Sequence, residues 1–281
     1  MMVVALLASA LAADLGGRFS ADPWAPAMDG GLIGTDTSAL PEGYEARLLT
    51  TLAYHPLMAY TATGVEPVVG AALTVHASAV WRLGPARLGL RLPGVALLSA
   101  DGLDHPRATA GDPELQLKLR PWSSERAGVA VLLGGTAPLD GSAWWAGADG
   151  PTASAGLALD VHPGPWIAAL DLGAELRPST ILTLSGDGEA PTLGGQWRAR
   201  LGVGRQFQWS FISIEAAAAT GVADPGEAVN TPLEVLAQLE RRRPDGRSWR
   251  VGGGIGVLPG VGAPALRLLV GVGQRPAPEA P

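Results

Sequence analysis

The sequence predicts an all-β fold, a closed antiparallel transmembrane β-barrel of about twelve strands. Apolar and polar residues alternate with a period of two along much of the chain, short and long connections alternate between these segments, and tryptophans gather near segment ends. The 281 residues include 39 glycines and 24 prolines, which disfavour helices. Mean hydropathy is +0.21, yet no run reaches the ~20 apolar residues of a spanning helix. Such apolarity is expected where each strand presents half of its side chains to lipid.

The clearest alternation runs from Val68 to Leu92. Even-numbered positions up to Arg82 are mostly small or polar, with Val80 as the apolar exception, and odd-numbered positions are apolar. Gly84-Pro85 then predicts a two-residue hairpin turn, after which arginine and glycine alternate with leucine. Successive side chains of a strand point to opposite faces, so the sequence predicts an apolar face toward lipid and a polar face toward the lumen.

The two ends of the chain differ from this pattern. Residues 1–13 are apolar and end in small residues, which predicts a secretory signal peptide, although no Lys or Arg precedes Arg18; the alternative is an apolar N-terminal strand. Residues 14–43 are rich in Gly, Asp and Pro and predict an irregular lead-in. The barrel is expected over 44–274 and is followed by a Pro-rich tail, 275–281.

The strands are expected in the following order. The first spans 44–54 and is followed by a long connection, 55–67. The hairpin around Gly84-Pro85 supplies the second and third strands, and the fourth spans 111–120, where Glu, Gln, Lys and Arg alternate with leucine. The remaining strands are predicted at 126–136, 152–162, 166–177, 193–204, 207–220, 233–243, 248–258 and 265–274.

The lengths of the connections alternate. Those at 84–85, 122–125, 163–165, 205–206 and 244–246 are short, whereas 55–67, 99–111, 137–151, 178–192 and 221–232 are long. Outer-membrane barrels have short periplasmic turns and longer external loops. The pattern therefore predicts that both termini lie in the periplasm.

A family resemblance rests on the segment that Gly111-Asp112 opens, with leucines alternating with Lys118 and Arg120. It resembles the strands of bacterial outer-membrane barrels, both OmpA-like proteins and the MetA-like family of putative outer-membrane transporters. The resemblance covers 44–274 and implies a place in the outer membrane of a Gram-negative bacterium. An OmpA-like protein would continue into a periplasmic peptidoglycan-binding domain, which the tail 275–281 does not resemble.

The parity of each strand predicts a set of charged side chains that face the lumen. Both signs are interspersed, so we expect ion pairs between neighbouring strands. The set is Glu45, Arg47, Arg82, Arg87, Arg91, Glu114, Lys118, Arg120, Asp160, Asp171, Glu175, Arg198, Arg200, Glu234, Glu240, Arg250 and Arg267. In particular, Arg243 to Arg247 reads as a three-residue hairpin loop that places Glu240 opposite Arg250.

Four tryptophans near strand ends predict an aromatic girdle at the membrane interface: Trp81, Trp122, Trp166 and Trp249. The alternative is that they cap the ends of a soluble sheet.

Few motifs point to catalysis or metal binding. His76 and Ser78 are similar to the His-x-Ser of outer-membrane phospholipases, but their parity places both in the lumen, where a lipid-hydrolysing site would not meet its substrate. The loop groups Asp101, Asp104, His105 and Asp187, Glu189 lack calcium-loop spacing and are read as solvated charge. The sequence therefore predicts no catalytic residue, no metal and no cofactor.

The expected function is a narrow, weakly selective pore or transporter for small solutes. A structural envelope barrel with a charge-filled lumen is the alternative, and an outer-membrane lipid hydrolase is a remote third. The expected partners are outer-membrane lipid and small solutes. The net charge of −6 and the lack of a basic patch give no indication of nucleic acid, and the absence of cysteine excludes a disulfide framework.

Overall fold

The computed structural model describes residues 25–29, 32–61, 64–99, 108–139, 147–148, 150–181, 192–223, 225–226, 231–258, 260 and 263–276. These residues form an all-β protein, and no helix among them is long and apolar enough to cross a membrane. The predicted signal peptide and most of the tail lie outside this part of the chain.

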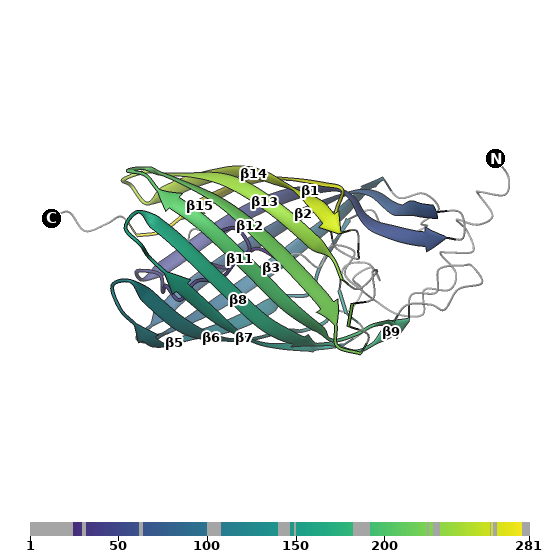
Figure 1. The fold of residues 1–281 in the computed structure, drawn as a ribbon, viewed down its shortest axis with the longest axis horizontal. Helices are drawn as coiled ribbons and strands as arrows, with labels where there is room; N and C mark the ends of the chain where they lie inside the picture. The colour runs from purple at the N-terminus through teal and green to yellow at the C-terminus, as the bar shows by residue number, and fades with distance from the viewer. Residues whose placement is uncertain are drawn as a thin grey trace.

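Long antiparallel strands form a closed, tilted barrel (Figure 1). The strands of the wall are β1 (Tyr44–Thr61), β2 (Gly64–Leu83), β3 (Ala86–Ser99), β5 (Glu114–Ser123), β6 (Ala127–Thr136), β7 (Thr152–Val161), β8 (Trp166–Leu176), β11 (Gln196–Gln206), β12 (Ser210–Gly221), β13 (Leu233–Arg242), β14 (Arg247–Leu258) and β15 (Leu266–Gln274). Three shorter strands, β4 (Ala108–Ala110), β9 (Thr180–Ile181) and β10 (Thr192–Leu193), lie within connections.

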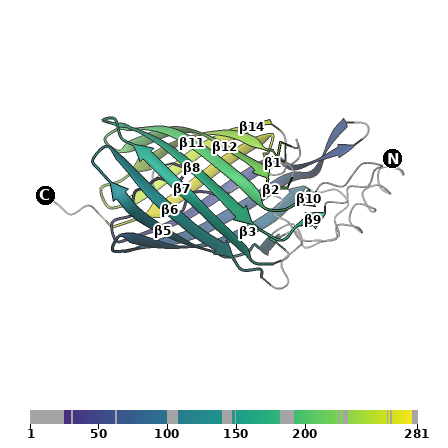
Figure 2. The same cartoon turned by 60° about the horizontal axis from the view of Figure 1, so that its bottom comes forward.

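Each wall strand pairs with its neighbour in sequence, and the ring closes where β1 pairs with both β2 and β15. The 13-stranded sheet of the described residues includes the three-residue β4, which pairs only with β3, so twelve strands make up the wall. This confirms the predicted barrel. Figure 2 shows β5, β6, β7, β8, β11 and β12 following one another along one side of the barrel.

The short turns gather at one end of the barrel, which we call the short-turn end. Gly84, Gly164 and Gly246 have φ values of +63°, +66° and +84°, a conformation that glycine adopts without strain. Because Ala46 pairs with Gln274, β1 begins and β15 ends at this same end. The chain therefore enters and leaves the wall beside the short turns.

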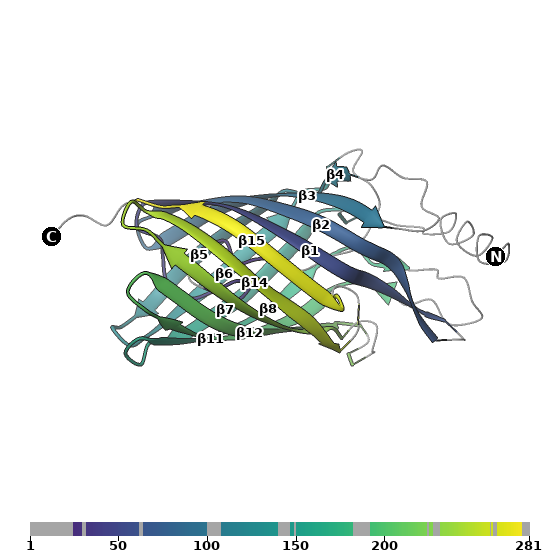
Figure 3. The ribbon, with the colours of Figure 1, turned by 90° about the horizontal axis from the view of Figure 1, so that it is seen from above.

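The predicted long connection 55–67 is wrong. β1 and β2 continue as a paired hairpin beyond Tyr54, the last residue of β1 that pairs with β15 (Figure 3). Register shifts follow Tyr54, and His55 has a positive φ of 52°. These irregularities interrupt the period of two, which explains why the sequence pattern ended there.

Other long connections contain short paired segments. β4 pairs with β3 within the predicted loop 99–111, and β9 pairs with β10 at the base of the loop 178–192. The loop groups Asp101, Asp104, His105 and Asp187, Glu189 lie outside the described residues.

The alternating pattern of β2 corresponds to two different environments. Thr74 and His76 are buried inside the barrel, whereas Leu73 and Val75 are half-buried on the outer face and Trp81 is exposed there. Arg82, in contrast, lies exposed beside the turn, where its Nε donates to the carbonyl of Gly84. Exposed leucines, valines or isoleucines lie on the outer face of every wall strand except β13, and together they form an apolar belt.

This difference is testable with spin labels at positions 73 and 74. A label at 73 should be readily accessible to a lipid-soluble quencher and a label at 74 should be protected, because adjacent side chains point to opposite faces of the wall. The measurement is power-saturation electron paramagnetic resonance in vesicles. Equal accessibility at the two positions would contradict a lipid-facing outer surface for β2.

Candidate functional site: the occupied lumen

A segment that precedes β1 lies inside the barrel, which the sequence did not predict. It comprises residues 25–29 and 32–40, and we call it the plug segment. It has neither helix nor strand, as expected for the Gly-, Asp- and Pro-rich lead-in, but most of its residues are buried. Met28, Leu32 and Ile33 are among the most completely buried apolar side chains, at 0–2 % exposure.

Acidic side chains anchor the plug segment to cations of the wall. Asp29 accepts hydrogen bonds from Arg87 of β3 at 3.0 Å and Lys118 of β5 at 2.7 Å. Lys118 also lies 3.1 Å from Asp36 and donates to the carbonyl of Ala39 at 3.4 Å. Arg87 and Lys118 are both fully buried, and a buried cation is tolerated only when it is paired. Arg87 and Lys118 therefore require the carboxylates of the plug segment as partners.

Carboxylates of two other wall strands hold the backbone of the plug segment. Glu215 of β12 accepts N–H bonds from Ile33, and from Gly34 and Thr35 at 2.9 Å each. Asp160 of β7 accepts the N–H of Ser38. Hydrogen bonds to a charged acceptor are about twice as strong as neutral ones. These two carboxylates thus satisfy backbone donors that irregular buried chain would otherwise leave unpaired.

Arginines of the wall bind carbonyl groups of the same segment. Arg91 donates to the carbonyl of Pro26, and Arg200 of β11 donates to that of Gly34 at 2.6 Å. Donors and acceptors of the plug segment are therefore both met by charged side chains, from β3, β5, β7, β11 and β12.

Two apolar contacts complete the packing. Ile33 packs with Leu49, Leu236 and Leu269, and Leu32 packs with Ala169 and Phe211. These wall residues point inward, so the lumen contains a small hydrophobic core.

Glycines of the inner wall leave room for the plug segment. A Cβ at Gly128 would lie 2.8 Å from Cβ of Ser38, and one at Gly202 would lie 2.9 Å from Cδ1 of Leu32. At Gly89 it would lie 2.6 Å from Sδ of Met28. Side chains at these positions would overlap with the plug segment.

We expect Gly128→Ala to loosen the plug segment. Alanine there forces Ser38 away from the wall, and loss of the Ser38–Asp160 hydrogen bond would cost about 1.5–3 kcal/mol. The measurements are the thermal unfolding midpoint, which should fall, and single-channel conductance, which should rise. Gly94→Ala is the matched control, because a Cβ at Gly94 has no atom within 4 Å. If the two variants have the same unfolding midpoint and conductance, the close approach of Ser38 to Gly128 does not contribute to binding of the plug segment.

The remaining predicted lumen charges form ion pairs along the wall. Glu234 binds Arg267 at 2.7 Å, Glu175 binds Arg198 at 3.1 Å, and Asp171 lies 3.8 Å from Arg200. Further pairs are Glu45–Arg47, Glu114–Arg91 and Glu240–Arg250. Arg120 is half-buried near the short-turn end. Asp160, which the sequence placed in this set, contacts the plug segment and lies within ion-pair distance of His162.

The hairpin that joins β13 and β14 has the predicted register. Glu240 is paired with Arg250, with Oε1 3.4 Å from Nη2, and Arg242 with Ser248. The N–H of Gly246 donates to the carbonyl of Arg243 at 3.1 Å. Glu240 also accepts from Arg242 at 3.0 Å. The turn prediction is confirmed.

His76 and Ser78 both belong to the inner face of β2, and His76 is 4 % exposed. An apolar substrate in the membrane would not reach them from outside the wall. No cluster of potential metal-binding side chains occurs among the residues that the structure describes.

The four tryptophans of the predicted girdle are all exposed, at 40–53 %. Each lies within a few residues of a short turn, so all four lie at the short-turn end. Arg205 stacks over the ring of Trp166 with 5.2 Å to its centroid, which adds a cation to this band.

No family model and no curated protein matches the chain. Among solved structures, the COG4313 outer membrane channel from Pseudomonas putida F1 is similar, with a TM-score of 0.62, 15 % identity, and coverage of 88 % of this chain and 98 % of that one. The chain therefore shares the β-barrel fold of this structure. The NanC porin (TM-score 0.53, 10 % identity, 83 % and 99 % coverage) and the KdgM porin with oligogalacturonate (TM-score 0.50, 9 % identity, 82 % and 98 % coverage) share this fold.

Proposed function

We propose that this protein is a narrow, weakly selective pore or transporter for small solutes in the outer membrane of a Gram-negative bacterium. The short-turn end, where β1 begins and β15 ends, would lie on the periplasmic side. The observation that carries the proposal is the plug segment. It fills a twelve-stranded wall, and every contact described for it is a hydrogen bond, an ion pair or van der Waals packing. Such contacts are reversible, so the width of the open pore depends on how strongly the plug segment binds to the wall.

The outer membrane is supported by the apolar outer face together with the charged interior, an arrangement that suits lipid outside and a polar lumen. The fold shared with outer-membrane channels supports the same location. Of the two families that the sequence resembles, we favour the MetA-like transporters. OmpA-type barrels are small, with ≈ 8 strands and an interior that side chains fill, whereas this wall has more strands than that.

The alternative is a structural envelope barrel whose lumen never opens. It is favoured by the density of buried ion pairs around the plug segment, which resembles a protein core. We propose no enzymatic role, since the similar proteins are channels and the His76–Ser78 pair faces the lumen.

The deciding experiment is a planar bilayer recording of the purified protein. Stepwise conductance supports the pore. Silence of the wild-type protein, and equally of variants that release the plug segment, would establish the structural barrel. A protein fold check by heat-modifiable gel mobility accompanies each recording.

A further inference from the structure

A groove of about 690 Å³ crosses the outer face of the barrel near the short-turn end. It spans the neighbouring strands β14, β15, β1, β2 and β3. Its floor is low because Ala46 pairs with Ala79 and the next outward residue of β2 is Ala77. Taller side chains, among them Trp249 and Leu92, rise on either side. The groove is thus a long apolar depression in a surface that otherwise carries leucine and valine.

Two arginines lie at the end of this groove. Arg243 and Arg247 line it, and their side chains are 62 % and 70 % exposed. Asp245 lies between them, at 3.8 Å and 3.9 Å, which is the outer limit of an ion pair. One carboxylate at that distance leaves several guanidinium donors for an external anion.

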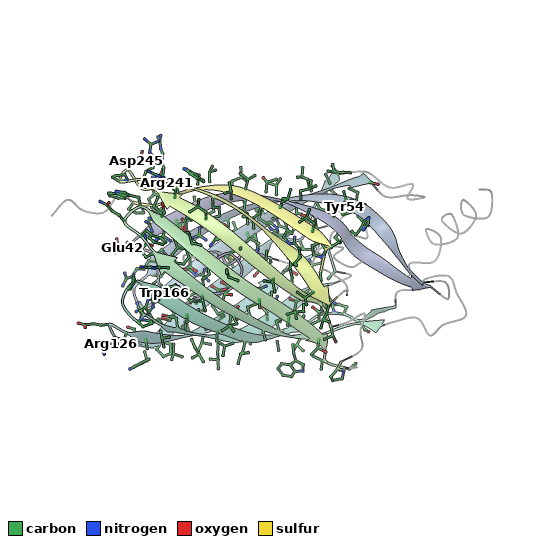
Figure 4. The ribbon with its side chains drawn as sticks, turned by 45° about the horizontal axis from the view of Figure 1, so that its top comes forward. Glu42, Tyr54, Arg126, Trp166, Arg241 and Asp245 are labelled. Atoms are coloured by element: carbon green, nitrogen blue, oxygen red, sulfur yellow. The ribbon has the colours of Figure 1, made fainter. Side chains whose placement is uncertain are left out.

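The surroundings of the groove are basic as well. Among the residues whose side-chain exposure the structure describes, every exposed charged side chain lies at the short-turn end. Six are arginines (Arg82, Arg126, Arg205, Arg241, Arg243 and Arg247) and three are acidic (Glu42, Glu125 and Asp245). Figure 4 shows labelled members of both kinds at this end, with Tyr54 far from them. An anionic ligand therefore meets a favourable field here.

We propose that this groove binds one anionic phospholipid of the adjacent leaflet, with an acyl chain along the alanine floor and its phosphate between Arg243 and Arg247. A free phosphate would use the arginines but not the apolar floor. A zwitterionic lipid would use the floor but gain less from the cations. Only an anionic lipid matches both parts, as basic sites at the membrane surface do elsewhere. The proposal rests on the membrane-spanning arrangement, not on conduction.

The test uses delipidated full-length protein in neutral detergent and native mass spectrometry. The probes are dioleoyl phosphatidylglycerol, dioleoyl phosphatidylcholine and inorganic phosphate. We expect phosphatidylglycerol to bind at least about tenfold more tightly than phosphatidylcholine. The double variant Arg243→Gln/Arg247→Gln should lose this preference, whereas Asp245→Asn should strengthen it.

The apolar part is tested with Ala77→Leu, which fills the floor with a side chain that lipid tolerates. It should weaken binding of both phospholipids, because both would use the floor. Arg126→Gln is the matched control, an exposed arginine at the same end but outside the groove, and it should bind as the wild type does. Heat-modifiable mobility confirms an intact barrel in each variant.

Three outcomes would overturn the proposal. One is a phosphatidylglycerol preference that survives the loss of both arginines. Another is displacement of the lipid by inorganic phosphate at equal concentration, which would indicate a simple anion site. The third is unchanged lipid binding in Ala77→Leu. Conductance does not enter these readouts, so a silent barrel that binds the lipid would refute the pore alone.

Discussion

Deletion of residues 25–38 should raise single-channel conductance roughly tenfold or more, because a twelve-stranded wall freed of its filling encloses a bore wider than that of a small filled barrel. The deletion removes Asp29, Asp36 and the backbone groups that Glu215 and Asp160 bind. Residues 39–43 remain to lead into β1. The measurement is a planar bilayer recording at fixed salt.

The deletion also leaves Arg87 and Lys118 without the plug carboxylates. We therefore expect the open barrel to favour anions, since water and chloride would solvate these cations. The control is Asp29→Asn/Asp36→Asn, which keeps the length of the segment but removes its charge. It should give flickering openings of intermediate conductance. A deletion variant that folds but conducts no better than the wild type would show that the bore is closed elsewhere.

Glu234→Gln should destabilise the barrel by about 3–5 kcal/mol, the usual cost of removing one partner from a buried ion pair. Arg267 is fully buried and donates two hydrogen bonds to Glu234, at 2.7 Å and 3.2 Å. Without the carboxylate the charge of Arg267 remains buried on the inner face of the wall. The measurement is the free energy of unfolding by urea in lipid vesicles.

The double variant Glu234→Leu/Arg267→Met should recover much of this loss, because a well-packed apolar pair replaces both buried charges. Arg243→Gln, which lies exposed in the turn, serves as the control and should change stability by less than about 1 kcal/mol. Equal effects of Glu234→Gln and Arg243→Gln would show that Arg267 is solvated in the folded barrel.

Local patterns were sufficient to predict the wall. The period of two separates the faces of β2, and the glycine in Arg243–Arg247 fixes the register of Glu240 and Arg250. Both are short-range properties that strand geometry makes unambiguous. The β1–β2 extension was missed because irregular pairing after Tyr54 breaks that period.

The filled lumen could not be predicted in the same way. Residues 25–40 have no periodicity, and their partners are far away in sequence, such as Glu215, which is 182 positions from Ile33. The inward charges gave one indication that something fills the lumen. Arg87 and Lys118 carry the same charge and are register partners on the neighbouring strands β3 and β5. Two buried cations side by side require a carboxylate from outside the wall. Asp29 and Asp36 were two of the five acidic residues of the lead-in that could supply it.

The hydrogen bonds between Glu215 and the backbone of residues 33–35 also restrict the order in which parts of the barrel can assemble. The part of the chain that is synthesised first is secured by a strand that is synthesised among the last, so its hydrogen bonds cannot form until β12 is in place. β15 must then pair with β1 to close the barrel. By that time the plug segment must already lie inside the barrel or still be able to enter it. Contacts so distant in sequence slow folding. Pairing of β1 with β15, which closes the barrel, is therefore the step that a factor assisting membrane insertion would help most, by keeping these two strands apart until the plug segment is inside.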